Sequence, residues 1–175
     1  EISKYNKMKS RHRYYANPIR DYAMILIMMS TGCRVKEVTG LKFEDVDLHN
    51  SLVVFRDTKN GFSITRDISK KAVDAIGDYL SIRETESEYM FINRRGNKLA
   101  TDSINDRIEY YISISGIDKH FTSHCIRSTF ATLYHEQCGD IEMVKEALNH
   151  QSIKTTMRYV KADEYKKKVK TGFCL

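Results

Sequence analysis

The dipeptide Asn60-Gly61, which lies between two runs of β-favouring residues, constrains the fold of this chain more than any other local feature. Both residues tolerate a positive φ, so an Asn-Gly pair in this setting is the strongest short-range signal of a β-hairpin. The two runs are residues 51–55 and residues 62–68. We therefore expect one small antiparallel sheet, with Lys59 at the tip of its hairpin.

Apart from this hairpin, the chain has the apolar spacing of helices. A first helix is expected to begin at Pro18, because a missing N–H costs nothing at the start of a helix, and to run to about Met28. It is apolar on nearly all sides, which predicts a central position. The pair Thr31-Gly32 ends it. The next helix has one apolar stripe, at Val35, Val38 and Leu41.

Later helices are marked by polar residues that can act as N-caps. These residues are Ser69, Asp102, Ser123, Asp140 and Ser152, and the helices are expected over 69–82, 102–115, 123–139, 140–148 and from 152 onward. Residues 89–92 predict a short strand, closed by a turn at 95–96. The whole pattern is that of a mostly helical α+β domain with a small antiparallel sheet, not of alternating βαβ units.

Length and charge narrow the class of protein. The 175 residues correspond to one domain, and the formal charge of +6 suits a polyanionic partner. The four cysteines form no C-x-x-C pair and are expected to be reduced thiols, as in a cytosolic protein. The apolar run 22–29 is too short to span a bilayer. We expect a basic lead-in at 1–16 that continues from a segment upstream, a domain at 17–165 and a tail at 166–175.

Five residues, in the order Arg34, His124, Arg127, His150 and Tyr159, form a set suited to phosphate chemistry. Each guanidinium offers a planar, permanently charged fork to the non-bridging oxygens of a phosphate. The imidazoles can donate hydrogen bonds or move protons near neutral pH. The tyrosine supplies a nucleophile. Because phosphoryl transfer depends mostly on positioning and charge neutralisation, the set predicts an enzyme that breaks a phosphodiester bond.

The sequence around these residues resembles the catalytic domain of the tyrosine recombinases, the family of phage and transposon integrases. The similarity runs from about residue 17 to residue 165. Its motifs are TGCRVKEV at 31–38 with Leu41, HCIRSTFAT at 124–132, and LNHQS at 148–152 followed by Thr155, Thr156 and Tyr159.

Two positions depart from the pattern that the family usually has. Ser128 follows the second arginine, where a histidine is usual, so a neighbour that can carry charge is replaced by one that cannot. Asn149 precedes the last histidine, where a glycine is usual. Asparagine is the next-best residue for a left-handed helix end, so we expect the turn to survive.

The resemblance implies the DNA breaking-rejoining enzyme fold and a site-specific recombinase or integrase that serves the integration or excision of a mobile element. Tyr159 would form a covalent 3′-phosphotyrosine and release a 5′-hydroxyl, without metal, ATP or another cofactor. Lys59 would protonate the leaving 5′-hydroxyl, and His124 would assist that proton transfer. Glu37 would orient Arg34 or a histidine.

The resemblance also implies the partners and location of the protein. Its partner would be double-stranded DNA at a recombination site, bound by a protein that is a monomer alone and a homo-tetramer on DNA. We expect no membrane contact and a cytoplasmic, nucleoid-associated location in a bacterium or a phage-infected cell. The family's N-terminal DNA-binding domain is not within this sequence. DNA binding is therefore expected to be weak, directed at phosphates and steeply salt-dependent.

Simpler interpretations exist for single residues. Arg34 and Glu37 are three apart on a helix and could form only a surface ion pair. His120 and His124 could be a metal pair, although no third ligand stands at a zinc-like spacing. The sequence rivals are Tyr165 for the nucleophile and Lys70 or Lys71 for the acid.

Two other functions compete with a recombinase. A relaxing enzyme of the type IB topoisomerase kind would use the same chemistry without exchanging strands between sites. A non-catalytic DNA-binding regulator is suggested by the helices on either side of Gly139-Asp140, which have the look of a helix-turn-helix. The regulator hypothesis leaves Arg34, His150 and Tyr159 unexplained.

Overall fold

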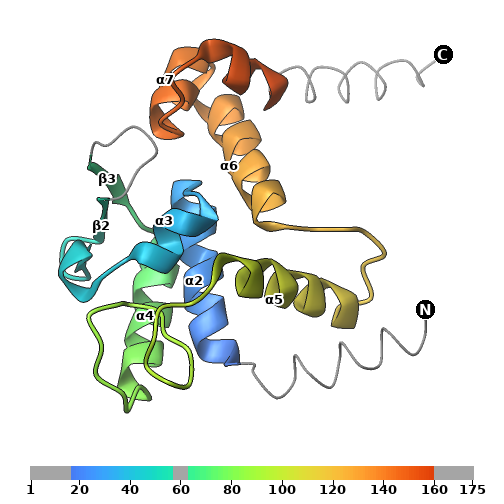
Figure 1. The fold of residues 1–175 in the computed structure, drawn as a ribbon. Helices are drawn as coiled ribbons and strands as arrows, with labels where there is room; N and C mark the ends of the chain where they lie inside the picture. The colour runs from blue at the N-terminus through green and yellow to red at the C-terminus, as the bar shows by residue number, and fades with distance from the viewer. Residues whose placement is uncertain (1–16, 57–62, 160–175) are drawn as a thin grey trace.

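The structure is a computed structural model that describes residues 17–56 and 63–159 (Figure 1). Its helices are α2 (Pro18–Thr31), α3 (Val35–Gly40), α4 (Lys70–Ser81), α5 (Thr101–Ile114), α6 (Ser123–Cys138) and α7 (Ile141–Ala147). Residues 153–159 are also helical. A 3-10 turn η1 (Phe43–Asp45) precedes the strands β1 (Val46–Asp47), β2 (Leu52–Phe55) and β3 (Ile64–Asp67). The predicted α+β class, mostly helical with one small antiparallel sheet, is confirmed.

Helix α2 begins and ends as its sequence predicts. The side chain of Asn17 accepts a hydrogen bond from the backbone N–H of Arg20, and Pro18 occupies the first turn. At the other end Gly32 adopts a left-handed φ of 61° and donates to the carbonyl of Met28. The helix is central, packing on α4 and α6, but it is not buried on all sides, because Met29 is 55% exposed.

The three strands form one antiparallel sheet in the order β1-β2-β3. Strands β2 and β3 pair with Val53 opposite Arg66 and Phe55 opposite Ile64. The predicted hairpin is therefore present. Its connecting loop, residues 57–62, lies outside the described residues, and so does Lys59.

Three local predictions were wrong. Residues 89–92 do not form a strand but make two isolated bridges, Lys42 with Tyr89 and Ile92 with Lys98, because each side finds only one partner before the chain turns. Asp102 is not an N-cap, because α5 already starts at Thr101. The carboxylate of Asp102 lies in the first turn, near the positive end of the helix dipole. Thr122 rather than Ser123 is the N-cap of α6.

The other predicted caps agree with the structure. Ser69 accepts from the backbone N–H of Ala72 across 3.2 Å, and Asp140 accepts from that of Glu142 across 2.8 Å. Gly139 closes α6 in the left-handed region. The predicted lead-in at 1–16 and tail at 166–175 lie outside the described residues.

Two apolar clusters hold the fold together. The larger is built around α2, α4 and the sheet, and the smaller consists of Ala131, Val144 and Leu148, with Tyr159 packed against it. Figure 1 shows α6 and α7 at one end of the molecule, joined to α5 by an extended connection. The junction between the two clusters brings α3, α6 and the end of α7 together. None of the helices within residues 17–56 and 63–159 has the length and hydropathy of a membrane span.

Candidate active site

The end of helix α7 is a Schellman turn that presents His150. Asn149 has a φ of 50°, its N–H donates to the carbonyl of Glu146, and the N–H of His150 donates to the carbonyl of Lys145, both across 3.0 Å. The expectation that asparagine preserves this turn is confirmed. The carbonyls of residues 147–149 are left for partners outside the helix.

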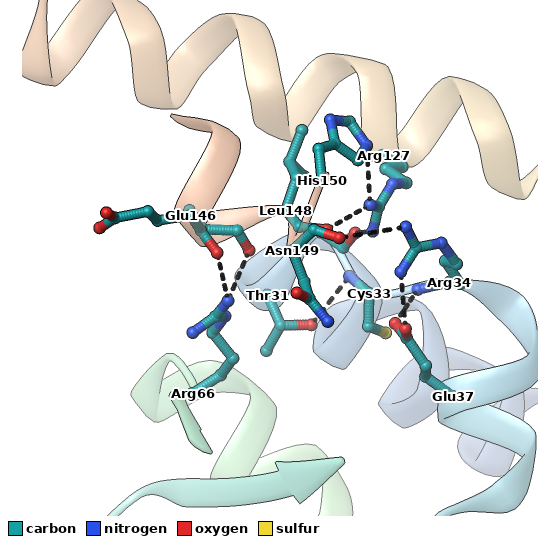
Figure 2. A network of polar contacts seen from close by, with 12 residues as sticks. Thr31, Cys33, Arg34, Glu37, Arg66, Arg127, Glu146, Leu148, Asn149 and His150 are labelled. Atoms are coloured by element: carbon teal, nitrogen blue, oxygen red, sulfur yellow. Dashed lines mark hydrogen bonds and ion pairs between the residues drawn. The ribbon is translucent and has the colours of Figure 1, made fainter. Parts of the chain in front are cut away.

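Arg34 meets this turn from the start of α3. Its backbone N–H and Nη1 both donate to the carboxylate of Glu37, across 2.6 and 2.9 Å, and its Nη2 lies 3.5 Å from the carbonyl oxygen of Asn149 (Figure 2). Glu37 is only 9% exposed. The ion pair of the simpler interpretation therefore exists, but it fixes the guanidinium against the turn instead of leaving it on an open surface.

Arg127 connects the three sequence motifs. It is buried in α6, donates through Nη1 to the carbonyl of Gly32 across 2.5 Å, and donates through Nη2 to the carbonyl of Leu148 across 2.6 Å. Burial lowers the pKa of the guanidinium, and the nearby charge of Arg34 lowers it further. An arginine stays charged even so. The guanidinium groups of Arg34 and Arg127 thus both contact the short turn that follows α7.

His150 is held from both ring nitrogens. Its Nε2 lies 3.1 Å from Nη2 of Arg127, and its Nδ1 lies 2.9 Å from Oγ1 of Thr156. Burial, followed by the charges of Arg127 and Arg34, lowers the pKa of His150 to about 4, so the ring is neutral at pH 7. Because a guanidinium can only donate, Nε2 accepts, and the proton sits on Nδ1, which donates to Thr156.

Tyr159 lies over the histidines. Its ring centroid is 6.1 Å from that of His150, with nearly parallel planes, and 6.3 Å from that of His124. It is half-buried, whereas His124 is exposed. A cavity of about 480 Å³ opens beside the tyrosine, lined in part by His124, Ser128 and Arg158. The structure thus brings together Arg34, Glu37, His124, Arg127, His150 and Tyr159, while Lys59 lies outside the described residues.

Sequence reasoning missed two residues of this site. Thr156 is fully buried and holds the ring of His150, a role that its place in the third motif does not reveal. Arg66 of β3 donates through Nη2 to the carbonyls of Glu146 and Ala147, across 2.8 and 2.9 Å. No sequence signal predicts the hydrogen bond between Arg66 and Ala147, because these residues are 81 positions apart.

The other residues considered for metal binding or for chemistry lie outside the site or are unreactive. His120 is 3.6 Å from Glu109 of α5, in an exposed pair. No group of three or more potential metal ligands occurs among residues 17–56 and 63–159. Ser128 donates its hydroxyl to the carbonyl of His124 in its own helix. Cys33 lies beside Arg127, but burial raises the pKa of its thiol to about 12 and keeps it protonated.

The sequence matches the phage integrase family over residues 3–166. It is 35% identical to the tyrosine recombinase XerA of Thermococcus kodakarensis over 145 residues, which are 81% of this chain and 51% of that protein. It is 32% identical to the tyrosine recombinase XerC of Actinobacillus pleuropneumoniae over 148 residues, 83% of this chain and 48% of that protein. The chain spans about half the length of these relatives.

Solved structures agree with this assignment. The crystal structure of XerA recombinase superposes with a TM-score of 0.75 at 30% identity, over 91% of this chain and 57% of that one. The XerH recombinase bound to its difH substrate has a TM-score of 0.71 at 23% identity, over 89% and 47%, and so supports the fold alone. The fold and the motifs are those of the tyrosine recombinase family. The chain belongs to the phage integrase family, the family of the tyrosine recombinases.

Proposed function

We propose that this chain cuts and rejoins DNA through Tyr159. The observation that carries the proposal is the meeting of Arg34, Arg127 and His150 at one turn, with the ring of Tyr159 above the histidine. A phosphodiester beside this turn would have a charged clamp on its non-bridging oxygens and a hydroxyl nucleophile within the same site.

Each step of the reaction balances without an external energy source. The phenolic oxygen of Tyr159 attacks the scissile phosphorus, a P–O bond forms to the tyrosine, and the bond to the 5′-oxygen breaks. The phenolic proton passes to water, and the 5′-oxygen gains a proton from Lys59, with His124 assisting transfer. Lys59 then takes up a proton from water. The product is a 3′-phosphotyrosine. Attack by a 5′-hydroxyl of a partner strand reverses these bonds and reseals the DNA, so the chemistry needs neither ATP nor a metal ion.

Electrostatic stabilisation by the two arginines is the largest contribution we assign. Negative charge spreads over the phosphate oxygens in the transition state, and preorganised donors in a partly desolvated site stabilise it more than water does. Arg127 is fixed by two backbone carbonyls and Arg34 by Glu37, so both guanidiniums are already held at the site when the charge develops.

Double-stranded DNA is the proposed partner. The XerH structure is of a recombinase bound to its difH substrate. The net charge of +6 suits such a partner. Exchange between two sites by a tetramer, a role for a mobile element and a cytoplasmic location near the nucleoid complete the proposal.

The test is a search for a covalent protein–DNA adduct in the presence of EDTA. Supercoiled plasmid and nicked duplexes with randomised cores are incubated with the chain and with a version extended upstream, and the products are separated on denaturing gels. Tyr159→Phe and Tyr165→Phe are matched variants that each lose one hydroxyl. An adduct lost only in Tyr159→Phe supports the proposal, and an adduct retained by that variant removes Tyr159 as the nucleophile.

The same gels separate the competing functions. Two-site recombinant products indicate a recombinase, and relaxation of the plasmid without such products indicates the topoisomerase kind of enzyme. DNA binding without an adduct in either version of the chain favours the regulator.

A further inference from the structure

Three arginines from different elements converge on three successive carbonyls. Arg66 of β3 reaches Ala147, Arg127 of α6 reaches Leu148, and Arg34 at the start of α3 reaches Asn149. Figure 2 shows Arg66 on the side of the turn opposite to His150, away from the other two guanidiniums. The chemistry assigned above uses only two of these arginines.

We propose that Arg66 is a positioning residue of the site, which clamps the end of α7 so that the turn holds Arg34, Arg127 and His150 in place. This inference rests on the proposed function. Arg66 does not contact the phosphate in it. It acts through the backbone that the two phosphate-binding arginines and the histidine share.

The hydrogen bonds of Arg66 explain why it can do this. Its Nη2 donates to the carbonyls of Glu146 and Ala147 across 2.8 and 2.9 Å, which occupies both N–H bonds of that nitrogen. The carbonyl of Glu146 already accepts from the N–H of Asn149, whereas that of Ala147 is left over by the Schellman turn, and the dipole at this end of α7 favours a cation. The guanidinium is half-buried, and burial lowers its pKa.

The backbone of Arg66 is itself fixed. It lies opposite Val53 in the paired strands β2 and β3, so the clamp ties the sheet to the Schellman turn. The turn then carries the acceptors of both other arginines at Leu148 and Asn149, and His150 follows at once. A displacement of the end of α7 would therefore move all three groups together. Misplacement of reacting groups by about 1 Å can cost ~10²-fold in rate.

Arg83 provides a matched control. It also donates to several backbone carbonyls, those of Thr85, Ser87, Tyr89 and Met90, across 2.9–3.2 Å. It lies just after the end of α4, and the carbonyls that it bonds all belong to residues 85–90, outside the three motifs. Arg66→Met and Arg83→Met thus remove the same side-chain atoms and the same charge, and each breaks a set of arginine–carbonyl bonds.

The experiment combines two readouts on the same variants. The first is the rate of adduct formation on the DNA pool, together with DNA affinity over a salt series. The second is the ¹⁵N spectrum of the His150 ring, which needs no substrate. We expect Arg66→Met to form adduct about 10²-fold more slowly at unchanged DNA affinity, and to lose the single Nδ1–H tautomer of His150. Arg83→Met should change neither, and Arg66→Lys should recover part of the loss because it keeps a cation at the end of α7.

The outcomes separate this inference from the proposed function. If neither the parent chain nor its upstream-extended version forms an adduct, the proposed function fails and the His150 spectrum alone decides the positioning role. An Arg66→Met protein that matches Arg83→Met in both readouts overturns the inference. A loss of DNA affinity equal to the loss of rate overturns it as well, since it makes Arg66 a phosphate contact. If Arg66→Met does not fold, Arg66→Lys against Arg83→Lys carries the same test, with a smaller expected decrease.

Discussion

Nη2 of Arg127 donates to Nε2 of His150 across 3.1 Å, so the histidine accepts a hydrogen bond from its neighbour in the site. This polarity follows from the neutral ring. A phosphate oxygen beside Arg127 would offer that arginine a better acceptor and would favour a proton on His150. The protonated imidazole would then donate to the phosphate and add a third donor to the two guanidiniums.

The first prediction concerns pH and stability. The pKa of His150 is about 4 in the folded protein, against 6.5 for an ordinary histidine. Between these values the unfolded chain binds more protons than the folded chain. The free energy of unfolding should therefore fall as the pH decreases from about 6.5 to about 4, by up to ~3 kcal/mol from this group.

Urea unfolding at several pH values in this window measures the effect. Carboxylates also contribute to acid destabilisation, so the informative quantity is the difference between the parent and His150→Gln. The variant should show a shallower dependence on pH between 4 and 6.5. Equal slopes in the two proteins would contradict a lowered pKa at His150.

The second prediction concerns Thr156, whose Oγ1 accepts a hydrogen bond from the Nδ1–H of His150 in a fully buried position. Replacing it by valine keeps the shape but leaves the Nδ1–H without a partner. Thr156→Val should lower the free energy of unfolding by about 1–3 kcal/mol. The Nδ1–H tautomer of His150 should also no longer be fixed, which would change the ¹⁵N chemical shifts of its ring.

Thr155→Val is the control for Thr156→Val. Thr155 neighbours it in the same helical segment but is exposed, so the same substitution there should stay within about 0.5 kcal/mol of the parent. A Thr156→Val protein as stable as this control, with an unchanged ring spectrum, would show that the hydrogen bond does not hold His150.

The third prediction concerns Arg127. Its guanidinium bonds Gly32, Leu148 and His150 at once, which a single ammonium cannot reproduce in the same geometry. Arg127→Lys should lower the single-turnover rate of adduct formation by ~10²–10³ while DNA binding persists. Arg83→Lys serves as the control. A rate within threefold of the parent would contradict the role given to Arg127.

Much of the fold and site follows from local sequence. Pro18 and Gly32 mark the ends of α2, and Ser69 and Asp140 cap their helices because each signal acts within a few residues. The left-handed turn at Asn149 is local in the same way. The arginines, histidines and tyrosine of the site can be predicted from the sequence because few residue types can bind a phosphate, move a proton or act as a nucleophile.

The features that the sequence did not predict depend on tertiary contacts, or on a choice between adjacent residues of similar chemistry. Arg66 reaches the end of α7 across 81 positions in sequence, so no local signal marks it. Thr156 is one of two adjacent threonines, and only the packed structure tells which of them faces His150. The N-cap of α6 is Thr122 and not its neighbour Ser123, and because the Thr122 side chain makes no capping hydrogen bond, no local side-chain signal separates the two positions.

The last prediction concerns Gly32, which joins the first motif to the second. Its φ is 61°, and a Cβ there would lie 2.3 Å from Cδ1 of Phe130, a ring that stacks on Tyr134. Gly32→Ala therefore meets both left-handed strain and a collision with a packed ring. We expect the free energy of unfolding to fall by about 2–5 kcal/mol, the sum of these two costs.

Two other glycines separate the two costs of Gly32→Ala in the same unfolding measurements. Gly139 has a φ of 70° but open space around it, so Gly139→Ala should cost only the strain, about 1–2 kcal/mol. Gly77 lies in α4 with nothing near its Cβ position, so Gly77→Ala should stabilise the helix by about 0.5–1 kcal/mol. If Gly32→Ala costs no more than Gly139→Ala, the ring of Phe130 yields freely and does not fix the turn whose carbonyl Arg127 binds.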